Sequence, residues 1–181
     1  KKVAVLDYGV EHNLINSLLK RDCEVTVFPA STSADRLLAM KPDGIMLSNG
    51  PGDPEELADV VENIKKIVGI KPIVGICLGH QLLGLTLGGK TTKLKFGHRG
   101  CNHPVKDLEE NKVHITSQNH GYVVEKLPED VVATHININD GTIEGMKHIK
   151  LPIFSVQFHP EAAAGPQDSQ YIFDKFLKYA L

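Results

Sequence analysis

Residues 73–83 read IVGICLGHQLL, and this stretch decides the fold. The run from Ile73 to Ile76 has the apolar, β-branched composition of a buried strand. From Leu78 to Leu87 the apolar residues occur all round a helical period, which is typical of a helix that is buried on most sides. A strand that passes directly into a buried helix is the building unit of a parallel α/β sheet, so we expect this segment at the centre of one.

Earlier parts of the chain repeat the same unit. Short apolar runs from Lys2 to Leu6, Glu24 to Phe28 and Gly44 to Leu47 each precede a polar turn and an amphipathic segment. We expect these runs to be strands that helices cover on both faces. One of those helices is predicted to begin near Pro54, with Asp53 as its N-cap.

After residue 90 the chain changes to short β-type runs. They lie at Thr91 to Lys95, Val113 to Thr116, Tyr122 to Val124, Val131 to Ile136, Ile143 to His148 and Phe154 to Phe158. A hairpin turn is expected at Asn139-Asp140-Gly141, and a last helix from about Ser169 to Tyr179. The sequence therefore predicts one α/β domain over residues 1–181, an open, mostly parallel, twisted sheet flanked by helices, with antiparallel strands added in the second half.

Composition excludes several classes of partner. The 20 Lys and Arg residues nearly balance the 22 Asp and Glu residues, so no broad positive field would attract nucleic acid or an anionic membrane. Apolar runs are too short to cross a bilayer, and no signal peptide is evident. The three cysteines form no CxxC pair, which favours free thiols and a cytoplasmic protein. Because residue 1 is Lys rather than Met, we expect the chain to be part of a longer one.

Cys77 lies at the junction of the predicted strand and helix, with Gly75 and Gly79 two positions away on either side. This is the pattern of a nucleophile elbow, in which a tight turn exposes the reactive side chain above the sheet. Peptide dipoles at the helix N-terminus would favour the thiolate, the reactive form. The alternative is a buried structural cysteine, which is the interpretation that we keep for Cys23 and Cys101.

A thiolate needs a base and a group that orients the base, and His159-Pro160-Glu161 offers both. In extended backbone, residues i and i+2 point to the same side, and proline at 160 favours extended geometry at His159. The segment follows a predicted strand, and the carboxyl ends of strands are where open α/β sheets bind ligands. Taken alone, such a pair would more often be a surface histidine and glutamate.

Residues 48–54, read SNGPGDP, follow another predicted strand. Gly50 and Gly52 carry backbone N–H groups, which together with the N–H of Leu78 could bind an oxyanion. One such donor is typically worth about 2.7 to 4 kcal/mol of reaction barrier. A turn without a ligand is the alternative for this loop.

Taken together, residues 75–81, the HPE segment and the Gly50-Pro51-Gly52 loop resemble the class I glutamine amidotransferase family. Further segments are similar to the C-terminal half of the small-subunit family of carbamoyl phosphate synthetases: residues 47–54, 97–100, 102–104, 117–122 and 154–161. The resemblance covers essentially all 181 residues. It implies the flavodoxin-like fold of these amidotransferases.

The resemblance also implies roles for individual residues. Cys77 would be the nucleophile, His159 the general base and acid, and Glu161 the residue that orients His159. Gly52 and Leu78 would supply the oxyanion N–H groups. L-Glutamine would be held by a wider set: Gly50, Gly52, Leu78, Gln81, Asn119, Gly121 and Tyr122. Relatives often have Phe where this chain has Tyr122, which keeps the ring and adds a hydroxyl.

Partners follow from the same resemblance. The resemblance implies a glutaminase domain that hydrolyses L-glutamine to glutamate and ammonia through a cysteine thioester. We expect the ammonia to pass to a large ATP-using synthetase subunit or domain that forms carbamoyl phosphate, with no cofactor in this domain and ATP on the partner only. The small subunit normally has an N-terminal half, which this sequence lacks. Alternatives are the glutaminase of another pathway, such as GMP or anthranilate synthesis, and a non-catalytic module in which Cys77 senses redox state or the cleft binds a ligand.

Two other patterns are discounted. Residues 84–91, read GLTLGGKT, fit the P-loop pattern, but Gly84 lies inside a predicted helix and Thr91 begins a strand, the reverse of a P-loop. His98, Cys101 and His103 cluster in sequence without a standard zinc spacing or an evident fourth ligand. We therefore expect no metal and regard this cluster as loop structure or a contact between subunits.

Overall fold

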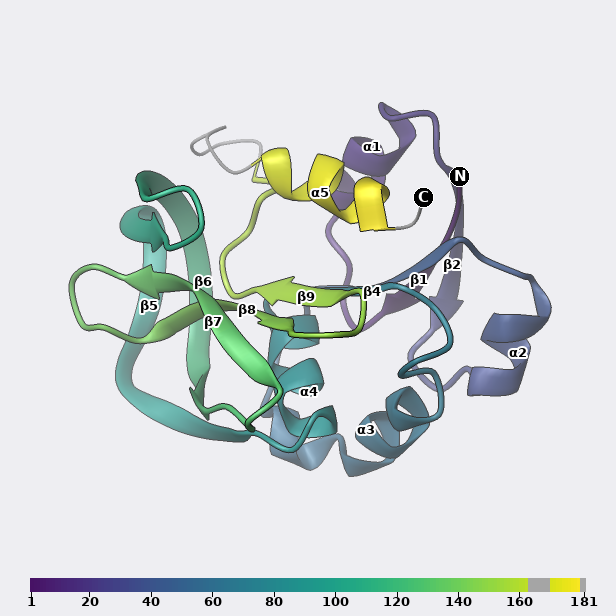
Figure 1. Cartoon of the computed structure of the whole chain (residues 1–181), viewed down its shortest axis with the longest axis horizontal. Coiled ribbons are helices and arrows are strands. Elements are labelled where there is room, and N and C mark those ends of the chain that lie inside the picture. The colour runs from purple at the N-terminus through teal and green to yellow at the C-terminus, as the bar shows by residue number, and fades with distance from the viewer. Residues whose placement is uncertain (163–169, 180–181) are drawn as a thin grey trace.

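The computed structural model describes residues 1–162 and 170–179, and a nine-stranded sheet runs through this part of the chain (Figure 1). The strands are β1 (Lys2–Asp7), β2 (Glu24–Pro29), β3 (Gly44–Leu47), β4 (Ile73–Ile76), β5 (Lys90–Asp107), β6 (Lys112–Lys126), β7 (Val131–Asn137), β8 (Ile143–His148) and β9 (Ile153–Val156). The helices are α1 (His12–Leu19), α2 (Ala34–Ala39), α3 (Ala58–Lys65), α4 (Leu78–Thr86) and α5 (Tyr171–Tyr179), with a 3-10 turn at Pro54–Glu56.

The sheet has a parallel and an antiparallel half that meet at β9. Its strand order is β2-β1-β3-β4-β9-β8-β7-β5-β6. From β2 to β9 the neighbouring strands are parallel, in the 2-1-3-4-5 order of flavodoxin-like folds. From β9 to β6 they are antiparallel. The predicted α/β sheet with antiparallel strands in the second half is confirmed, although the described pairings divide evenly between the two kinds.

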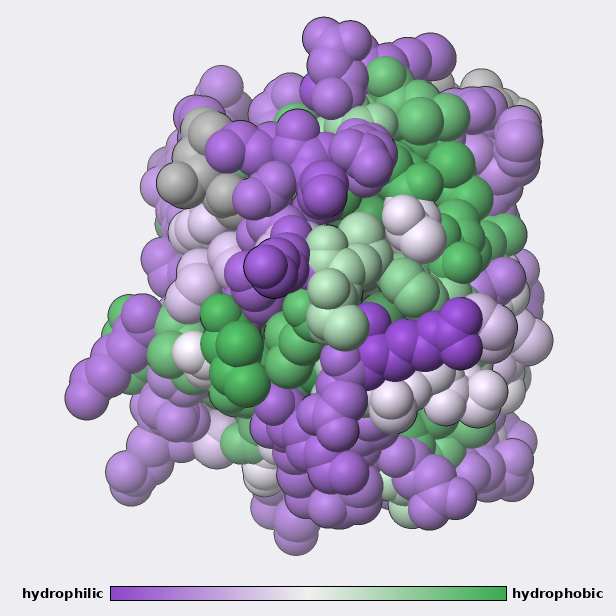
Figure 2. Space-filling model, turned by 90° about the vertical axis from the view of Figure 1, so that its right-hand side faces the viewer, coloured by the Kyte–Doolittle hydropathy of each residue, from purple (hydrophilic) through white to green (hydrophobic). Residues whose placement is uncertain are grey.

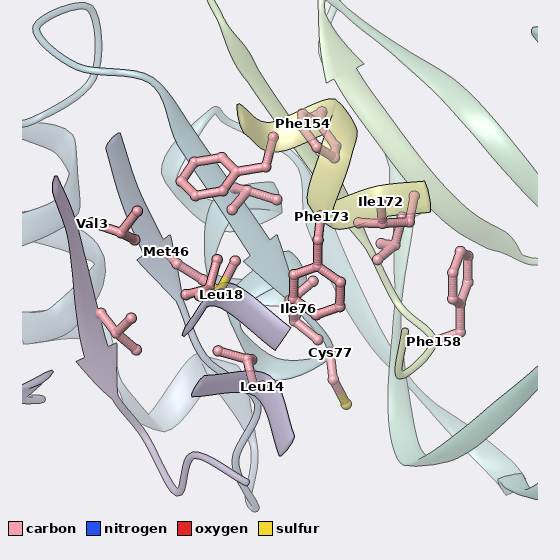
Figure 3. Close-up of a cluster of buried hydrophobic side chains, with 14 of the residues drawn as sticks. Val3, Leu14, Leu18, Met46, Ile76, Cys77, Phe154, Phe158, Ile172 and Phe173 are labelled. Atoms are coloured by element: carbon pink, nitrogen blue, oxygen red, sulfur yellow. The ribbon is translucent and has the colours of Figure 1, made fainter. Parts of the chain in front are cut away.

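Helices cover both faces of the parallel half. In Figure 1, α1 and α5 lie on one face, and α2, α3 and α4 lie on the other. The first face buries a cluster that includes Leu14, Leu18 and Phe173 (Figure 3). The second face buries residues such as Ile64 and Leu82. Strands β3 and β4 are buried along their whole length, as their continuous apolar sequence predicts.

Strand β2 corrects the expectation that every early strand is covered on both faces. It is the edge of the sheet, and its residues are exposed or half-buried, with Val27 41% exposed. The view from this side of the molecule shows apolar and hydrophilic surface side by side (Figure 2). An edge strand has a neighbour on one side only, which its composition alone does not reveal.

The observed bounds of α3, β5 and β6 differ from those that the sequence predicted. The Asp53 side chain caps the segment at Pro54, accepting from the N–H of Glu55, but a 3-10 turn forms first and α3 begins only at Ala58. The runs predicted at Thr91 to Lys95, Val113 to Thr116 and Tyr122 to Val124 are parts of two long paired strands, β5 and β6, interrupted by bulges. The last three predicted runs correspond to the separate strands β7, β8 and β9.

The predicted C-terminal helix is confirmed over Tyr171–Tyr179. The structure describes it from Tyr171, and Ser169, where we predicted its start, lies outside the described residues. Within the residues that are described, no helix has the length and apolarity to cross a membrane.

Candidate active site

Cys77 occupies a sharp turn between β4 and α4. Its backbone has φ 53° and ψ −103°, a conformation that residues other than glycine rarely adopt. The Cys77 N–H donates to the Val156 carbonyl on β9 at 2.9 Å, and the Gly79 N–H donates to the Ser48 carbonyl after β3 at 3.1 Å. The turn is therefore fixed from both neighbouring strands.

The two flanking glycines are required by close backbone packing. A Cβ at Gly79 would lie 2.2 Å from the Leu47 carbonyl oxygen, and one at Gly75 would lie 2.6 Å from the Gly79 backbone. These distances are far shorter than any normal contact, so both positions need the absence of a side chain.

The sulfur of Cys77 reaches a cleft although the residue is only 3% exposed. In Figure 3 the side chain lies at the margin of the apolar cluster, and its sulfur points away from that cluster. The cleft has a volume of about 600 Å³, within the usual range for small-molecule sites. It opens at the carboxyl ends of the parallel strands, where this class of sheet binds ligands.

His159 and Glu161 follow β9, the strand that pairs in parallel with β4. Nδ1 of His159 lies 2.7 Å from Oε1 of Glu161, and both side chains are buried. The His159 N–H also donates to the Ser117 carbonyl on β6 at 2.9 Å, which fixes the backbone of this segment. The structure thus places Cys77 and His159 in one cleft, with the carboxylate behind the imidazole.

The electrostatics of His159 depend on its two neighbours. Burial by itself would lower the pKa of His159, but the interactions with Cys77 and Glu161 outweigh it and raise the pKa to about 11. Nε2 of His159 is buried, and the interaction of the imidazole with Cys77 is one of the two that raise its pKa. A protonated imidazole beside the sulfur is suited to pairing with a thiolate and to passing a proton to a ligand.

The loop after β3 forms a second wall of the cleft. Gly50 packs against Tyr8, where a Cβ would lie 2.1 Å from the carbonyl oxygen, and Gly52 has φ 102°. The N–H groups of Gly52 and Leu78 have no partner among the described residues. Backbone donors left free beside a nucleophile can bind developing negative charge.

The remaining predicted ligand-binding residues also line the cleft: Gly50, Gln81, Asn119, Gly121 and Tyr122. Nε2 of Gln81 donates to the Tyr122 carbonyl at 2.8 Å, which ties α4 to β6. The Asn119 carbonyl oxygen lies 4.0 Å from the Cys77 sulfur. Every residue named as a site candidate is therefore brought to the same place, except that Leu78 and Glu161 lie beside the cleft rather than in its wall.

Gln157 is a neighbour of the sulfur that the sequence interpretation missed. It is fully buried, and its Nε2 donates to the Cys77 sulfur at 3.6 Å. The signal was present, because Gln157 precedes His159 by two residues and so shares its side of extended backbone. Other cleft residues that we did not predict include Glu11, Lys93, Arg99 and His120.

His120 belongs to a buried polar network behind the cleft. Its Nδ1 is 2.8 Å from the Tyr122 carbonyl oxygen, and its Nε2 lies 3.3 Å from Nδ1 of His98, whose Nε2 is 2.6 Å from Asp140. Burial lowers the pKa of His120 to about 3, so the ring is neutral. His120 therefore supports the part of the cleft wall that Tyr122 forms.

Within the sequence cluster His98, Cys101 and His103, the two histidine rings are neighbours, with their centroids 5.5 Å apart. Cys101 is exposed, and the ring of His103 bonds the Arg99 carbonyl at 2.9 Å. Among the described residues, ligating atoms within 4.8 Å of one another belong instead to His98, His120 and Glu144, and to Glu11, His159 and Glu161.

Glu144 is connected through Gln118 to His120 and has no exposed surface. Burial raises its pKa from the ordinary 4.5 to about 8, although hydrogen bonds from Gln118 and Asn137 act in the opposite direction. Its second carboxyl oxygen, Oε1, has no partner among the described residues. Burial therefore favours the protonated form of Glu144 in the folded protein.

We expect Glu144→Gln to stabilise the protein more at pH 8.5 than at pH 5.5. Between pH 4.5 and 8 the folded protein keeps a proton that the unfolded chain releases, so this carboxyl makes the protein less stable as pH rises. Glutamine has the same shape and does not titrate. Urea unfolding at the two pH values measures the effect, which we expect to reach a few kcal/mol, since one pKa unit is worth about 1.4 kcal/mol.

Glu109→Gln is the matched control. The Lys147 and Lys175 ammonium groups overcome the opposing effect of burial and hold the pKa of Glu109 below its usual value, so it stays ionised across this range. Its substitution should change stability equally at pH 5.5 and 8.5. An equal effect of Glu144→Gln at both values would mean that Glu144 is ionised in the folded state.

Residues 4–179 match the protein family described as glutamine amidotransferase class-I. The chain is 67% identical over its full length to the carbamoyl phosphate synthase small chain of Clostridium perfringens, of which it covers 52%. It is 55% identical over 98% of its length to the protein of that name from Methanocaldococcus jannaschii, covering 51% of it. The chain thus spans about half the length of these curated relatives.

Solved structures show the same fold. A candidate GMP synthase component from Thermoplasma acidophilum superimposes with a TM-score of 0.88 at 25% identity, over 99% of this chain and 93% of that one. A glutamine amidotransferase of Thermotoga maritima gives a TM-score of 0.69 at 16% identity, over 89% and 76% of the two chains.

Proposed function

This chain belongs to the class I glutamine amidotransferase family, and we propose that it hydrolyses L-glutamine to glutamate and ammonia for carbamoyl phosphate synthesis. The observation that carries this proposal is the meeting of Cys77 with His159 in one cleft, where Glu161 holds the imidazole. The order of groups, a nucleophile, a base and an orienting carboxylate, is that of covalent acyl transfer.

In the first half of the reaction the Cys77 thiolate attacks the carbon of the side-chain amide of glutamine. The amide oxygen becomes an oxyanion, which the N–H groups of Gly52 and Leu78 would bind. His159, protonated at Nε2, gives its proton to the amide nitrogen. The carbon–nitrogen bond then breaks, ammonia leaves, and a γ-glutamyl thioester remains on Cys77.

In the second half water cleaves the thioester. His159 is now neutral and takes a proton from the water that attacks the carbonyl carbon. The carbon–sulfur bond breaks, glutamate leaves, and the thiolate and the imidazolium are restored. Glu161 keeps its hydrogen bond to Nδ1 throughout, which fixes the tautomer and the orientation of the ring.

Recognition of glutamine falls to polar groups along the cleft wall. Asn119, Gly121 and Tyr122 on β6, together with Gln81 on α4, offer amide and backbone donors and acceptors. A free amino acid carries one ammonium and one carboxylate, and such directed groups can satisfy both.

The partner is proposed from the names of the relatives. Two chains that this one resembles at 67% and 55% identity are carbamoyl phosphate synthase small chains, and they are about twice as long. We propose that an N-terminal half completes the small chain, and that a large synthetase chain uses ATP to consume the ammonia. ATP would bind that partner only, with no cofactor in this domain, and the free thiols suit a cytoplasmic protein.

The test uses the full-length protein with and without its copurifying synthetase. We expect glutamate release from glutamine, and carbamoyl phosphate formation from glutamine, ATP and bicarbonate when the partner is present. Absence of glutamate release in both preparations would contradict the proposal. A γ-glutamyl-like electrophile should label Cys77 alone, whereas labelling of all three thiols would favour a redox or ligand-binding module.

A second candidate is the glutaminase of GMP synthesis. It is favoured by the TM-score of 0.88 to the Thermoplasma acidophilum protein. The two candidates share the chemistry of Cys77 and differ in the synthetase. Copurification with a synthetase that aminates a nucleotide, or with one of anthranilate synthesis, would replace the carbamoyl phosphate assignment.

A further inference from the structure

Gln157 approaches the Cys77 sulfur from the segment that follows β9 and also carries His159. Its backbone N–H donates to the Glu144 carbonyl on β8 at 2.9 Å, so the residue is held by the sheet. Its side chain has no exposed surface, and its Nε2 lies 3.6 Å from the sulfur, a normal distance for a hydrogen bond to sulfur. A buried amide group thus points at the sulfur, which is the reacting atom.

Gln81 determines which end of the Gln157 amide faces the sulfur. Nε2 of Gln81 donates both to the Tyr122 carbonyl oxygen, at 2.8 Å, and to Oε1 of Gln157, at 3.1 Å. Reversing the Gln81 amide would turn its oxygen toward the Tyr122 oxygen, and reversing the Gln157 amide would set two NH₂ groups against each other. The network therefore directs the NH₂ group of Gln157 to the sulfur.

We propose that Gln157 is a further catalytic residue, whose amide N–H donates to the Cys77 thiolate and holds it in position for attack. Gln81 is the positioning residue that orients this amide. The proposal rests on the proposed glutaminase function and adds a second hydrogen-bond donor to the sulfur. Unlike the imidazolium of His159, the Gln157 amide is neutral and keeps its protons through the reaction cycle.

The donor acts at the two points where the sulfur carries negative charge. Before attack it increases the share of thiolate, because hydrogen bonds to an ionised acceptor are about twice as strong as neutral ones. In the thioester the sulfur is neutral and accepts weakly. When water attacks and the carbon–sulfur bond breaks, charge returns to the sulfur, and the N–H stabilises the leaving thiolate.

The test replaces Gln157 with methionine, which has similar length and volume but no donor. In the full-length protein with Cys101→Ser, which removes the exposed thiol, the rate of Cys77 alkylation by iodoacetamide is measured against pH. We expect the midpoint of this profile to rise by about one unit and kcat for glutamate release to fall about 10- to 100-fold, the range of a lost charge-assisted hydrogen bond. Gln157→Glu should raise the midpoint further, because a carboxylate repels the thiolate.

Asn63→Leu is the matched control. Asn63 also has an amide with two internal hydrogen bonds, to the Ala34 N–H and the Thr32 carbonyl, far along the chain from the sulfur. Its substitution should lower thermal stability and leave the alkylation profile unchanged. An unchanged profile in Gln157→Met, or an equal shift in Asn63→Leu, would overturn the proposal.

The alkylation assay keeps this test separate from that of the function. It reports the state of the sulfur without requiring glutamine turnover. Wild-type protein that releases no glutamate would contradict the glutaminase function, whereas active wild-type protein with an unshifted Gln157→Met profile would contradict only the role of Gln157.

Discussion

Cys77→Ser is expected to abolish glutamine-dependent product formation, by at least about 1,000-fold in kcat. Removing a covalent nucleophile lowers kcat about as much as removing all the catalytic residues, because nucleophile, base and orienting group act only together. A hydroxyl in place of the thiol keeps the volume and the hydrogen bonds, but it is far less ionised at neutral pH. The assay is carbamoyl phosphate formation by the full-length protein in complex with its synthetase.

The same complex should continue to use free ammonia at nearly the wild-type rate. The substitution affects only the supply of nitrogen, because the turn at Cys77 keeps its backbone hydrogen bonds to Val156 and Ser48 whichever side chain it carries. Loss of the ammonia-dependent reaction as well would contradict a role confined to that supply. Cys101→Ser is the control, because Cys101 is exposed and its loss should leave both rates unchanged.

Gly79→Ala is expected to destabilise the protein by about 3 kcal/mol or more and to remove activity. The added Cβ would meet the Leu47 carbonyl oxygen at 2.2 Å and the Leu47 carbonyl carbon at 2.7 Å. Both atoms belong to the backbone of a buried strand, so relief requires α4 and β3 to separate. Separation would also break the Gly79 N–H bond to Ser48 and displace Cys77. Urea unfolding and glutamate release measure the two effects.

Gly84→Ala is the matched control in the same helix. Both changes gain the roughly 1 kcal/mol by which alanine exceeds glycine in helix propensity. At Gly84 the new Cβ would meet a side-chain methyl of Val124 at 2.8 Å, and a side chain can rotate or shift where a backbone cannot. We expect a much smaller loss of stability than at Gly79. Equal losses would mean that the packing of α4 as a whole, rather than the approach at the turn, sets the cost.

Much of the parallel half could be predicted because its signals are local. The apolar runs at 44–47 and 73–76 match β3 and β4 in both bounds. The long strands β5 and β6 could not be predicted as wholes. Gly97, Gly100 and Pro104 are turn-forming residues within β5, and both glycines have positive φ, 72° and 122°, at bulges where the pairing with β6 shifts register. That pairing is a tertiary effect, which local composition does not contain.

The candidate site likewise has a part that local sequence signals predict and a part that depends on tertiary pairing. Cys77, His159 and the loop at Gly50 lie at carboxyl ends of strands, so their meeting follows from parallel pairing of β3, β4 and β9. The pair of His98 and His120 with Asp140 depends on the register of β5 against β6 and on the hairpin after β7. Nothing in the sequence spacing of these three residues indicates that they touch.

The backbone angles at Cys77 lower the stability of the folded protein. A non-glycine residue at φ 53° and ψ −103° costs on the order of 1 to 3 kcal/mol relative to a relaxed conformation. Glycine at position 77 would release this strain and raise the free energy of unfolding, but it would remove the nucleophilic thiol. Stability and reactivity therefore oppose each other at a single residue, and the surrounding sheet tolerates the weaker conformation because its other interactions are strong.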